Sequence, residues 1–180
     1  RDREVMQAEA GRAIRPAERR DAAAVADLWN GMIRDSLSTF TTDEKTPQDI
    51  TALIATRAGA FWVAENAGKV LGFVTYGSFR GGPGYGATVE HSIVLSDAAQ
   101  GQGLGRGLMT RAVEAAAGEG HHVMVAAISS ANPGAVIFHK KLGFAQVGRM
   151  PEVGRKHGQW LDLILMQKPC QHPDFPGASG

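Results

Sequence analysis

This chain of 180 residues contains a single cysteine, almost no net charge and no long apolar run. Because Cys170 has no second cysteine to pair with, an intramolecular disulfide is excluded and nothing points to an oxidising compartment. The formal net charge of +1 gives no electrostatic footprint for nucleic acid. No apolar run approaches the roughly 18 residues of a membrane span, and Arg1–Arg12 lacks the apolar segment of a signal peptide. We therefore expect a cytoplasmic protein whose partner is neither nucleic acid nor a membrane.

Metal-ligating patterns are also missing. The six histidines are scattered, and the sequence has neither a His-x-x-x-His pair nor a cysteine cluster. Zinc sites are usually built from such closely spaced nitrogen and sulfur ligands. We therefore predict no metal site.

The composition is that of one ordinary globular domain. Hydrophobic residues make up 43% of the sequence and charged residues 21%, which suits a single full core in a chain of this length. Both ends carry sequence without hydrophobic periodicity. We expect a flexible N-terminal extension over residues 1–12, one domain over 13–168 and a flexible tail over 169–180.

Hydrophobic periodicity divides that domain into helices and strands. Apolar residues at spacings of three and four predict helices over 21–34, 47–58, about 108 to 118 or 120, and 133–142, with Asp21 and Asn132 as N-caps. Alternating or continuous apolar runs predict strands over 13–17, 61–65, 70–78, 88–96, 123–128, 145–150 and 160–167. Early strands form hairpins and later ones alternate with helices, so we expect an α/β fold with a mixed sheet and helices on both faces.

The most informative segment is the glycine-rich turn Gln100–Gly107, which lies between a predicted strand and a predicted helix. Such a turn gathers backbone N–H groups at a helix N-terminus, where phosphate binds. The lysine of a nucleotide-binding P-loop is missing, because Gly105 is followed by Arg106, and the glycine spacing of a dinucleotide-binding motif fails as well. A Gln-x-x-Gly-x-Gly pattern remains. Taken alone, this pattern also fits a flexible turn that binds nothing.

Further motifs accompany this turn in a fixed order along the chain. They are Thr88-Val89-Glu90-His91-Ser92, the strand His122–Ile128 with Asn132 beyond it, His139-x-x-Leu142-Gly143-Phe144, and Gly154-x-x-His157-Gly158-x-Trp160-x-Asp162. Together with the turn they resemble the GNAT superfamily of acyl-CoA-dependent N-acyltransferases, and within it the phosphinothricin and methionine sulfoximine or sulfone N-acetyltransferases. The resemblance covers about Ile14 to Gln167. It implies a mostly antiparallel mixed sheet that splays between its fourth and fifth strands.

The resemblance also implies acetyl-CoA as the cosubstrate. In this fold the pantetheine arm pairs with the sheet edge that the splay exposes, so backbone contacts are expected from Ile93, Val94 and Leu95. The pyrophosphate is expected on the turn, at Gln100, Gly101, Gln102, Gly103, Leu104, Gly105 and Arg106. Asn132 matches a residue that contacts the cofactor in the family, and it equally fits a simple helix N-cap.

Two side chains are candidates for proton transfer. Glu90 lies on an otherwise apolar strand, where a carboxylate needs a reason. We predict that it is the general base for the acceptor amine, and a carboxylate paired with a buried cation is the alternative. Many members of the superfamily protonate the leaving thiolate with a tyrosine, and this chain has His139 in that place. His139 is a general acid, part of a proton relay, or a packing histidine.

The acceptor implied by the resemblance is the α-amine of a small amino-acid-like molecule such as phosphinothricin, methionine sulfoximine or methionine sulfone. We expect Arg80 to hold its carboxylate. Substrate contacts are expected from Arg80, Gly81, Gly82, Glu90, His91 and Ser92. Relatives that act on methionine sulfone carry Arg-Pro-Phe where this chain has Arg80-Gly81-Gly82, and the missing aromatic leaves Phe40, Thr39 or Tyr85 to compensate.

Other functions stay open beside this one. The same fold acts on other small amines or on protein N-termini. A CoA-binding module without turnover is a further alternative, against which the presence of Glu90 argues. A homodimer with the acceptor site near its interface is implied by the resemblance alone.

Overall fold

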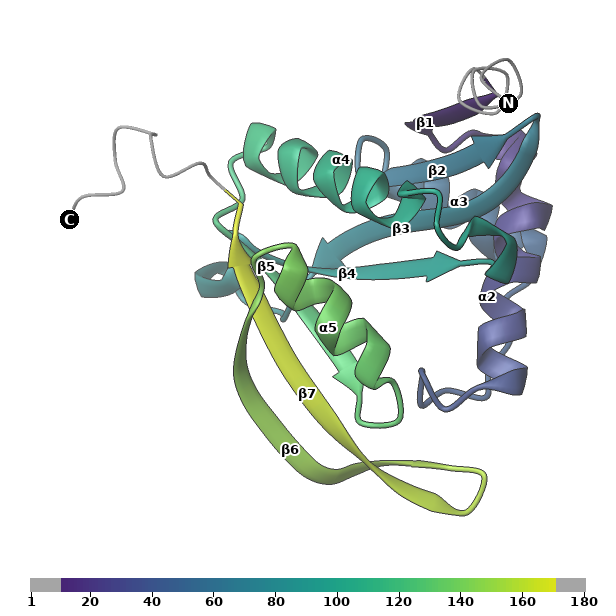
Figure 1. Cartoon of the computed structure of the whole chain (residues 1–180). Helices are drawn as coiled ribbons and strands as arrows, with labels where there is room; N and C mark the ends of the chain where they lie inside the picture. The colour runs from purple at the N-terminus through teal and green to yellow at the C-terminus, as the bar shows by residue number, and fades with distance from the viewer. Residues whose placement is uncertain (1–10, 171–180) are drawn as a thin grey trace.

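The computed structural model describes residues 11–170 and contains one seven-stranded sheet with helices on both faces (Figure 1). The strands are β1 (Arg12–Pro16), β2 (Phe61–Asn66), β3 (Lys69–Ser78), β4 (Thr88–Leu95), β5 (Val123–Ser129), β6 (Ala145–Lys156) and β7 (Gln159–Pro169). Their order in the sheet is β1-β2-β3-β4-β5-β7-β6. Neighbouring strands are antiparallel except β4 and β5, which run parallel. The predicted mixed, mostly antiparallel sheet is confirmed.

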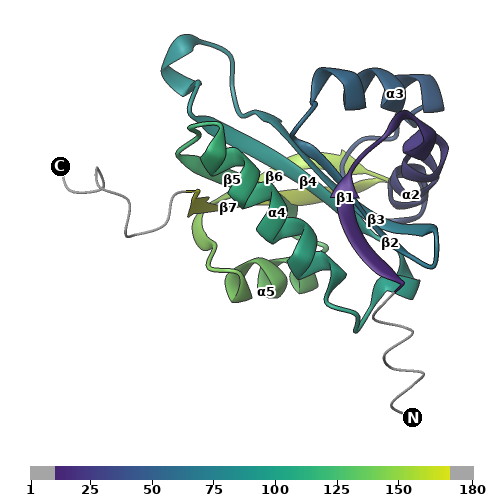
Figure 2. The same cartoon turned by 90° about the horizontal axis from the view of Figure 1, so that it is seen from above.

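Helices cover both faces of the sheet, as Figure 2 shows. They are α2 (Ala22–Asp35) and α3 (Pro47–Thr56) on one face, and α4 (Leu104–Gly118) and α5 (Pro133–Lys141) on the other. Each face buries its own apolar cluster, with Phe73 of β3 in the cluster under α2 and α3, and Val74 in the cluster under α4. Consecutive strand residues thus serve opposite layers, as the alternation of side chains along a strand requires.

Helix α4 begins at Leu104, earlier than the predicted start near residue 108. The sequence places the start of the helix too far along the chain because Gly105 and Gly107 have low helix propensity. In the fold these glycines allow close packing: a Cβ atom on Gly105 would lie 2.8 Å from Cδ1 of Leu95, and one on Gly107 would collide with Ile14. The first turn of α4 therefore lies directly against β4 and β1, next to the glycine-rich turn.

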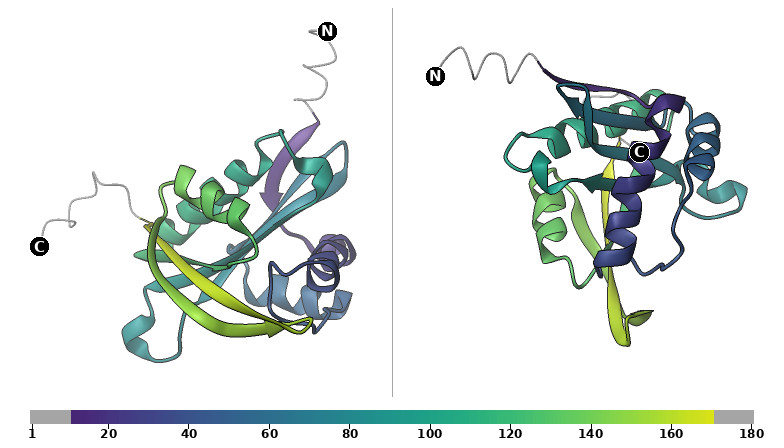
Figure 3. Two further views of the ribbon diagram at one scale, coloured as in Figure 1. Left: turned by 60° about the horizontal axis from the view of Figure 1, so that its bottom comes forward. Right: turned by 90° about the vertical axis from the view of Figure 1, so that its right-hand side faces the viewer.

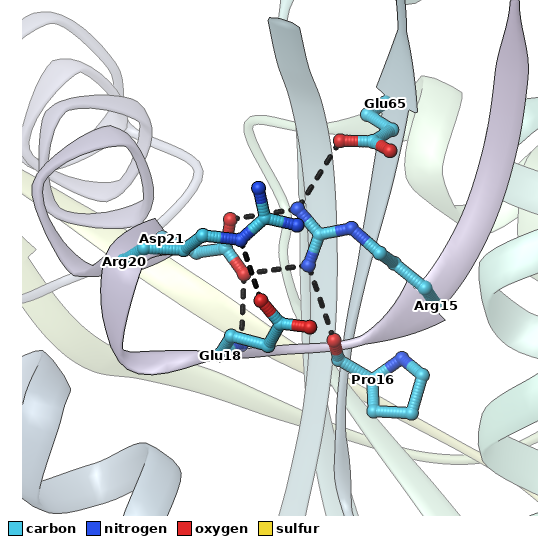
Figure 4. Close-up of polar contacts among 6 residues, drawn as sticks. All are labelled: Arg15, Pro16, Glu18, Arg20, Asp21 and Glu65. Carbon is cyan, nitrogen blue, oxygen red and sulfur yellow. Dashed lines mark hydrogen bonds and ion pairs between the residues drawn. The ribbon is translucent and has the colours of Figure 1, made fainter. Parts of the chain in front are cut away.

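Asp21 occupies the N-cap position of the first helix, as predicted, but its side chain takes part in an ion cluster (Figure 4). Helix α2 begins at Ala22, and the Asp21 side chain makes no capping hydrogen bond to it. Arg15 of β1 donates two hydrogen bonds of 2.8 Å to the Asp21 carboxylate and one of 3.1 Å to Glu65 of β2. Because Asp21 is buried, a charged donor is its strongest available partner. The cluster therefore links the start of α2 to β1 and β2.

The β6–β7 hairpin is longer than the predicted strands 145–150 and 160–167. The strand pattern ended at Pro151, which has no N–H to donate to a ladder. The structure accommodates this proline in an irregular stretch, because the register of β6 with β7 shifts between Met150 and Gly154. The hairpin extends beyond the helices and the rest of the sheet (Figures 1 and 3).

The first and last described strands reach into the segments that were expected to be an N-terminal extension and a tail. Arg12 belongs to β1 and Pro169 to β7, and the rest of the expected extension and tail, 1–10 and 171–180, lies outside the described residues. Asn132 caps α5 as predicted, since its Oδ1 accepts a 3.2 Å hydrogen bond from the N–H of Ala135. Between residues 11 and 170, no helix is long and apolar enough to cross a membrane.

Candidate active site

The parallel strands β4 and β5 separate soon after they meet. They pair over three residues of each strand, and Glu90, opposite Val125, is the last paired residue of β4. The remainder of β4, residues 91–95, pairs with β3 on one side and with no other strand of the described chain on the other. The predicted splay between the fourth and fifth strands is confirmed, and Glu90 lies at its apex.

Backbone alternation decides which groups of β4 face this open edge. The carbonyl of Thr88 accepts a hydrogen bond from the β3 side, and the N–H of Ser96, just beyond β4, donates to that same side. The backbone N–H and C=O groups of the even-numbered residues of β4 therefore point toward β3. Those of Ile93 and Leu95 point toward the open edge. Of the three predicted pantetheine contacts, Ile93 and Leu95 offer free backbone groups, whereas those of Val94 are committed to β3.

A hollow in two adjoining parts lies along the open edge. Its inner part, of about 240 Å³, is lined by Thr39, 91–93, Asn132 and His139 among other residues. Its outer part, of about 650 Å³, shares Asn132 and follows β4 to Asp97, near the glycine-rich turn. The two parts together follow β4 from His91, next to Glu90, to Asp97, three residues before Gln100, and neither Glu90 nor the glycine-rich turn lines them.

The glycine-rich turn forms a cradle of backbone N–H groups at the start of α4. Gly101 and Gly103 have φ angles of +74° and +70°, which side-chain-bearing residues rarely adopt. The N–H groups of Leu104, Gly105 and Arg106 have no acceptor within the described part of the chain. Free donors at a helix N-terminus suit a phosphate, so these residues fit the pyrophosphate of coenzyme A.

Two side chains of the turn, those of Gln102 and Leu104, are engaged within the fold. Leu104 is buried in the core. Gln102 donates a 2.7 Å hydrogen bond to the carbonyl of Ala98 and accepts one of 3.2 Å from Asn66, which ties the turn to β2. Arg106 is exposed, so it is the cationic side chain of the turn that can face an anion. The side chains of Gln102 and Leu104 are therefore engaged within the fold, which leaves only their backbone groups for the predicted cofactor contacts.

Glu90 is half-buried, and the structure shows no ion pair to it from any described residue. The guanidinium of Arg57 covers Gly77, the cross-strand partner of Glu90, without pairing with the carboxylate. Burial raises the pKa of Glu90 above its ordinary value. A carboxylate paired with a buried cation is therefore not what the structure shows, and the raised pKa suits a general base.

His91 and His139, predicted as a substrate contact and a proton donor, contact each other. Their Nε2 atoms are 3.0 Å apart. Nδ1 of His91 lies 3.1 Å from the carbonyl oxygen of Val125, and Nδ1 of His139 lies 2.7 Å from that of Ala135. Burial lowers the pKa of both imidazoles, and together with the neighbouring His139 it lowers that of His91 to about 3. The structure therefore joins two residues to which the sequence gave separate roles.

The predicted acceptor residues are only partly brought together. Ser92 lines the inner hollow beside His91. Arg80, Gly81 and Gly82 lie in the exposed β3–β4 loop and are not among the residues that line the hollow. In the segment 11–170, no group of three or more histidine, cysteine, aspartate or glutamate side chains is arranged to hold a metal ion.

A lysine that the sequence reasoning missed holds the loop between α2 and α3 against the hollow. Lys156, at the end of β6, is 2% exposed and donates hydrogen bonds to the carbonyl oxygens of Ser36, at 2.8 Å, and Thr39, at 2.9 Å. Phe40 of the same loop packs on Gly154, where a Cβ atom would come within 2.5 Å of its ring. The sequence shows Gly154 and Lys156 close to His157, but this local pattern does not indicate which residues they contact.

Comparison with known proteins agrees with this geometry. Residues 29–144 match the model of the acetyltransferase (GNAT) family. The chain is 38% identical over 161 residues to the L-methionine sulfoximine/L-methionine sulfone acetyltransferase of Pseudomonas aeruginosa, covering 86% of this chain and 92% of that protein. It is 34% identical over 165 residues to the phosphinothricin N-acetyltransferase of Streptomyces viridochromogenes, covering 91% and 90%.

Solved structures show the same fold. The structure of yncA from Salmonella typhimurium with its cofactor acetyl-CoA superposes with a TM-score of 0.86 at 35% identity, over 93% of this chain and 99% of that one. Sequence and architecture therefore agree over nearly the whole of both chains, beyond the glycine-rich turn and the splayed strands. This chain belongs to the GNAT family of acetyltransferases.

Proposed function

We propose that this enzyme transfers the acetyl group of acetyl-CoA to the α-amine of a small amino-acid-like molecule. The relatives described above are named for methionine sulfoximine, methionine sulfone and phosphinothricin, which all carry such an amine. The observation that carries the proposal is the hollow along the open edge of β4. It follows residues 91–97, which lie in the chain between Glu90, whose carboxylate has no ion-pair partner in the described chain, and the glycine-rich turn, so it can hold a donor and an acceptor end to end.

The donor half of the site is made mainly of backbone. The N–H groups of 104–106 hold the pyrophosphate, and the free groups of Ile93 and Leu95 pair with the pantetheine arm. Asn132 uses its Oδ1 atom to cap α5, which leaves its Nδ2 group to donate to the cofactor. These contacts position the thioester in the inner part of the hollow.

Glu90 acts as the base at the acceptor end. A free α-amine has a pKa of about 7.7–8.0 and is mostly protonated near neutral pH, so it must lose a proton before it attacks. Burial raises the pKa of the Glu90 carboxyl group, which brings its basicity closer to that of the amine. The amine nitrogen then attacks the thioester carbonyl directly, and the bond from carbon to sulfur breaks.

The leaving thiolate needs a proton, which His139 supplies as part of a relay. His139 lines the inner hollow beside His91 and Ser92. Since burial lowers its pKa, His139 is neutral near pH 7 and cannot act as a preloaded acid. It can pass on a proton only after it has received one during the reaction.

The acceptor is held by groups of the inner hollow and by the β3–β4 loop outside it. Arg80, which lies 5.3 Å from the centre of the Tyr85 ring, holds the substrate carboxylate, and Thr39 and Ser92 contact the rest of the molecule. Because Arg80 is exposed, a second copy of the chain completes this side of the site in a homodimer. The apolar side chains that the β6–β7 hairpin exposes support such an interface.

Release of free thiol from acetyl-CoA tests the proposal across a panel of amines. The panel contains methionine sulfoximine, methionine sulfone, phosphinothricin, a simple amine without a carboxylate and a peptide with a free N-terminus. We expect turnover with the amino-acid analogues and little with the other two. Turnover with the peptide alone would move the enzyme to another acceptor class, and tight CoA binding without turnover on any amine would make it a binding module.

A further inference from the structure

One charged side chain lines the inner part of the hollow. Among the described residues of that lining, Lys45 alone carries a charge near neutral pH, since burial lowers the pKa of His91 and His139. Its ammonium group forms no ion pair with any described carboxylate. Nζ lies instead 4.5 Å from the centre of the Trp29 ring, which also lines the hollow. The inner hollow therefore has a positive charge in its wall without a countercharge.

Two neighbouring residues of α2 fix the position of Lys45. Asn30 Nδ2 donates a 2.7 Å hydrogen bond to the carbonyl oxygen of Lys45, and the N–H of Lys45 donates one of 2.7 Å to Oδ1 of Asn30. The negative face of the Trp29 ring attracts the ammonium group. Both the backbone and the charged end of this lysine are thus held in place before any ligand binds.

Two carboxylates of the same segment are occupied by other partners. Glu44 pairs with Arg34 at 3.3 Å. Asp49 accepts a 2.8 Å hydrogen bond from the N–H of Thr46 in the capping box of α3. The hydrogen bonds with Thr46 hold the pKa of Asp49 below its ordinary value, and the charge of Lys45 adds a smaller contribution. The ammonium group of Lys45 therefore remains available to an anion in the hollow.

The lining of the inner hollow comes from both faces of the sheet (Figure 1). From the face of α5 comes Asn132, which the proposed function assigns to the cofactor. From the face of α2 and the α2–α3 loop come Lys45 and three hydroxyl groups, those of Ser38, Thr39 and Thr41. The donor thus lies against α5, and the polar groups of the loop are left for the acceptor.

Ser92 connects this lining with Glu90, which lies just outside the hollow. The two residues are two positions apart on β4, about 7 Å along the strand, and their side chains share one face. That face is the one toward α2 and α3, because Val94 belongs to the apolar cluster under these helices. An acceptor whose amine lies at Glu90 can therefore extend its side chain past Ser92 toward the loop hydroxyls and Lys45.

We propose that Lys45 selects acceptors whose side chain ends in an anionic group, such as a phosphinate or a carboxylate. This inference rests on the proposed function, in which Arg80 holds the α-carboxylate outside the hollow. The two anionic groups of one acceptor then meet two different cations. Lys45 donates charge-assisted hydrogen bonds to the end of the side chain, and Thr39 and Thr41 donate neutral ones. A neutral side chain of the same shape can use only weaker contacts with these groups.

Phosphinothricin and methionine sulfone are a matched pair of acceptors for testing this selection. Each side chain ends in a methyl group on a tetrahedral atom with two oxygens, and only phosphinothricin carries a negative charge there. We expect its Kd to be about 10-fold lower or less. Calorimetry with CoA in place of acetyl-CoA measures both values without turnover. Equal affinities, or tighter binding of methionine sulfone, would overturn the proposal in the wild-type protein.

Lys45→Met removes the charge and keeps most of the apolar stem on Trp29. We expect kcat/KM for phosphinothricin to fall about 10-fold to 100-fold, and kcat/KM for methionine sulfone to change less than about threefold. The Kd for acetyl-CoA should stay within about twofold. Lys45→Arg keeps the charge and should keep the preference for phosphinothricin. Lys140→Met, on an exposed lysine of α5, is the control and should change none of these values.

The outcomes separate this inference from the proposed function. An equal loss with both acceptors in Lys45→Met would mean that the lysine supports the loop and does not recognise charge. A raised Kd for acetyl-CoA would assign it to the cofactor. Either result would overturn the inference and leave the acetyltransferase standing. A wild-type protein that acetylates no amine would overturn the proposed function, and the selection of acceptors with it.

Discussion

Lys156 Nζ lies 2.8 Å from the carbonyl oxygen of Ser36, a residue 120 positions earlier in the chain. The same ammonium group lies 2.9 Å from the carbonyl of Thr39, and burial lowers the pKa of this lysine. A buried ammonium group without a carboxylate is stable only if backbone dipoles replace water around it. The loop between α2 and α3, which lines the hollow through Thr39, is therefore fixed in place by the end of the β6–β7 hairpin.

Lys156→Met should loosen this loop without touching the cofactor. Methionine keeps most of the apolar stem and loses both charge-assisted hydrogen bonds, which contribute about 1.5–3 kcal/mol each. We expect the KM for the acceptor to rise about 10-fold or more and the Kd for acetyl-CoA to stay constant. Steady-state kinetics measure the first value and calorimetry the second, and trypsin cleavage after Lys45 should become faster. Lys141→Met, on an exposed lysine, is the control, and an unchanged acceptor KM in Lys156→Met would contradict the assignment.

Glu90→Gln should remove the base and leave the fold and the cofactor site intact. We expect kcat to fall on the order of 100-fold, because glutamine has nearly the same shape and cannot take a proton at this pH. Glu114→Gln, on the exposed face of α4, is the matched control and should keep the wild-type rate. A Glu90→Gln enzyme with the wild-type kcat would remove Glu90 from the role of base.

The pH dependence gives an independent check on Glu90. The carboxylate form is the active one, and burial raises its pKa, so activity should fall as the pH drops through a value above the ordinary glutamate pKa of about 4.3. The acidic limb of kcat/KM measures that value. This limb should be absent from the residual activity of Glu90→Gln, and its persistence there would assign it to another group.

The ion cluster of Figure 4 makes a prediction about stability rather than activity. Arg15→Met leaves the buried Asp21 carboxylate without its cation and should lower the free energy of unfolding at pH 7 by about 3 kcal/mol. Burial alone would raise the pKa of Asp21, but the hydrogen bonds from Arg15 and from the N–H of Glu18 outweigh it, so the pKa is lowered. The cluster therefore stabilises the fold above the unfolded aspartate pKa of about 3.9, and this contribution is lost as the pH falls through the lowered value.

Urea unfolding at pH 7 and near pH 2 measures both parts of this prediction. The difference between wild type and Arg15→Met should shrink at the lower pH, because the Asp21 carboxylate takes up protons as the pH falls toward its lowered pKa. Arg20→Met is the control, because Arg20 pairs with Glu18 and both side chains are exposed, so about 0.5 kcal/mol or less is expected. Equal effects of the two substitutions would show that burial of the Arg15–Asp21 pair adds nothing to the free energy of unfolding.

The sequence predicts features that depend on neighbouring residues, but not features that depend on contacts between distant parts of the chain. The strand around Glu90, the glycine-rich turn and the Asn132 cap are local, and each follows from residues within a few positions of one another. The start of α4 was missed because Gly105 and Gly107 lower helix propensity locally and are needed only for contact with Leu95 and Ile14.

The contacts that organise the site span the chain and leave no periodic signal. His91 meets His139 across 48 positions, and Lys156 meets Ser36 across 120. Motif reasoning found two of these four residues, His91 and His139, without finding that they contact each other. The pairs follow from the order of strands and from the splay, which bring α5 over β4 and the β6–β7 hairpin to the loop after α2 (Figure 3).

The β6–β7 hairpin makes the last prediction, which concerns assembly. A two-stranded hairpin that leaves the body of the protein is marginal alone, and this one exposes Val147, Met150, Val153 and Trp160, the last to 57%. We expect the wild-type protein to sediment as a dimer and Val153→Asp to dissociate toward the monomer, because a charge in an apolar interface loses its hydration. Ile137→Asp, on an equally exposed apolar residue of α5, is the control and should leave the dimer intact. A monomeric wild type at every concentration, or an undisturbed Val153→Asp dimer, would exclude this face as the interface.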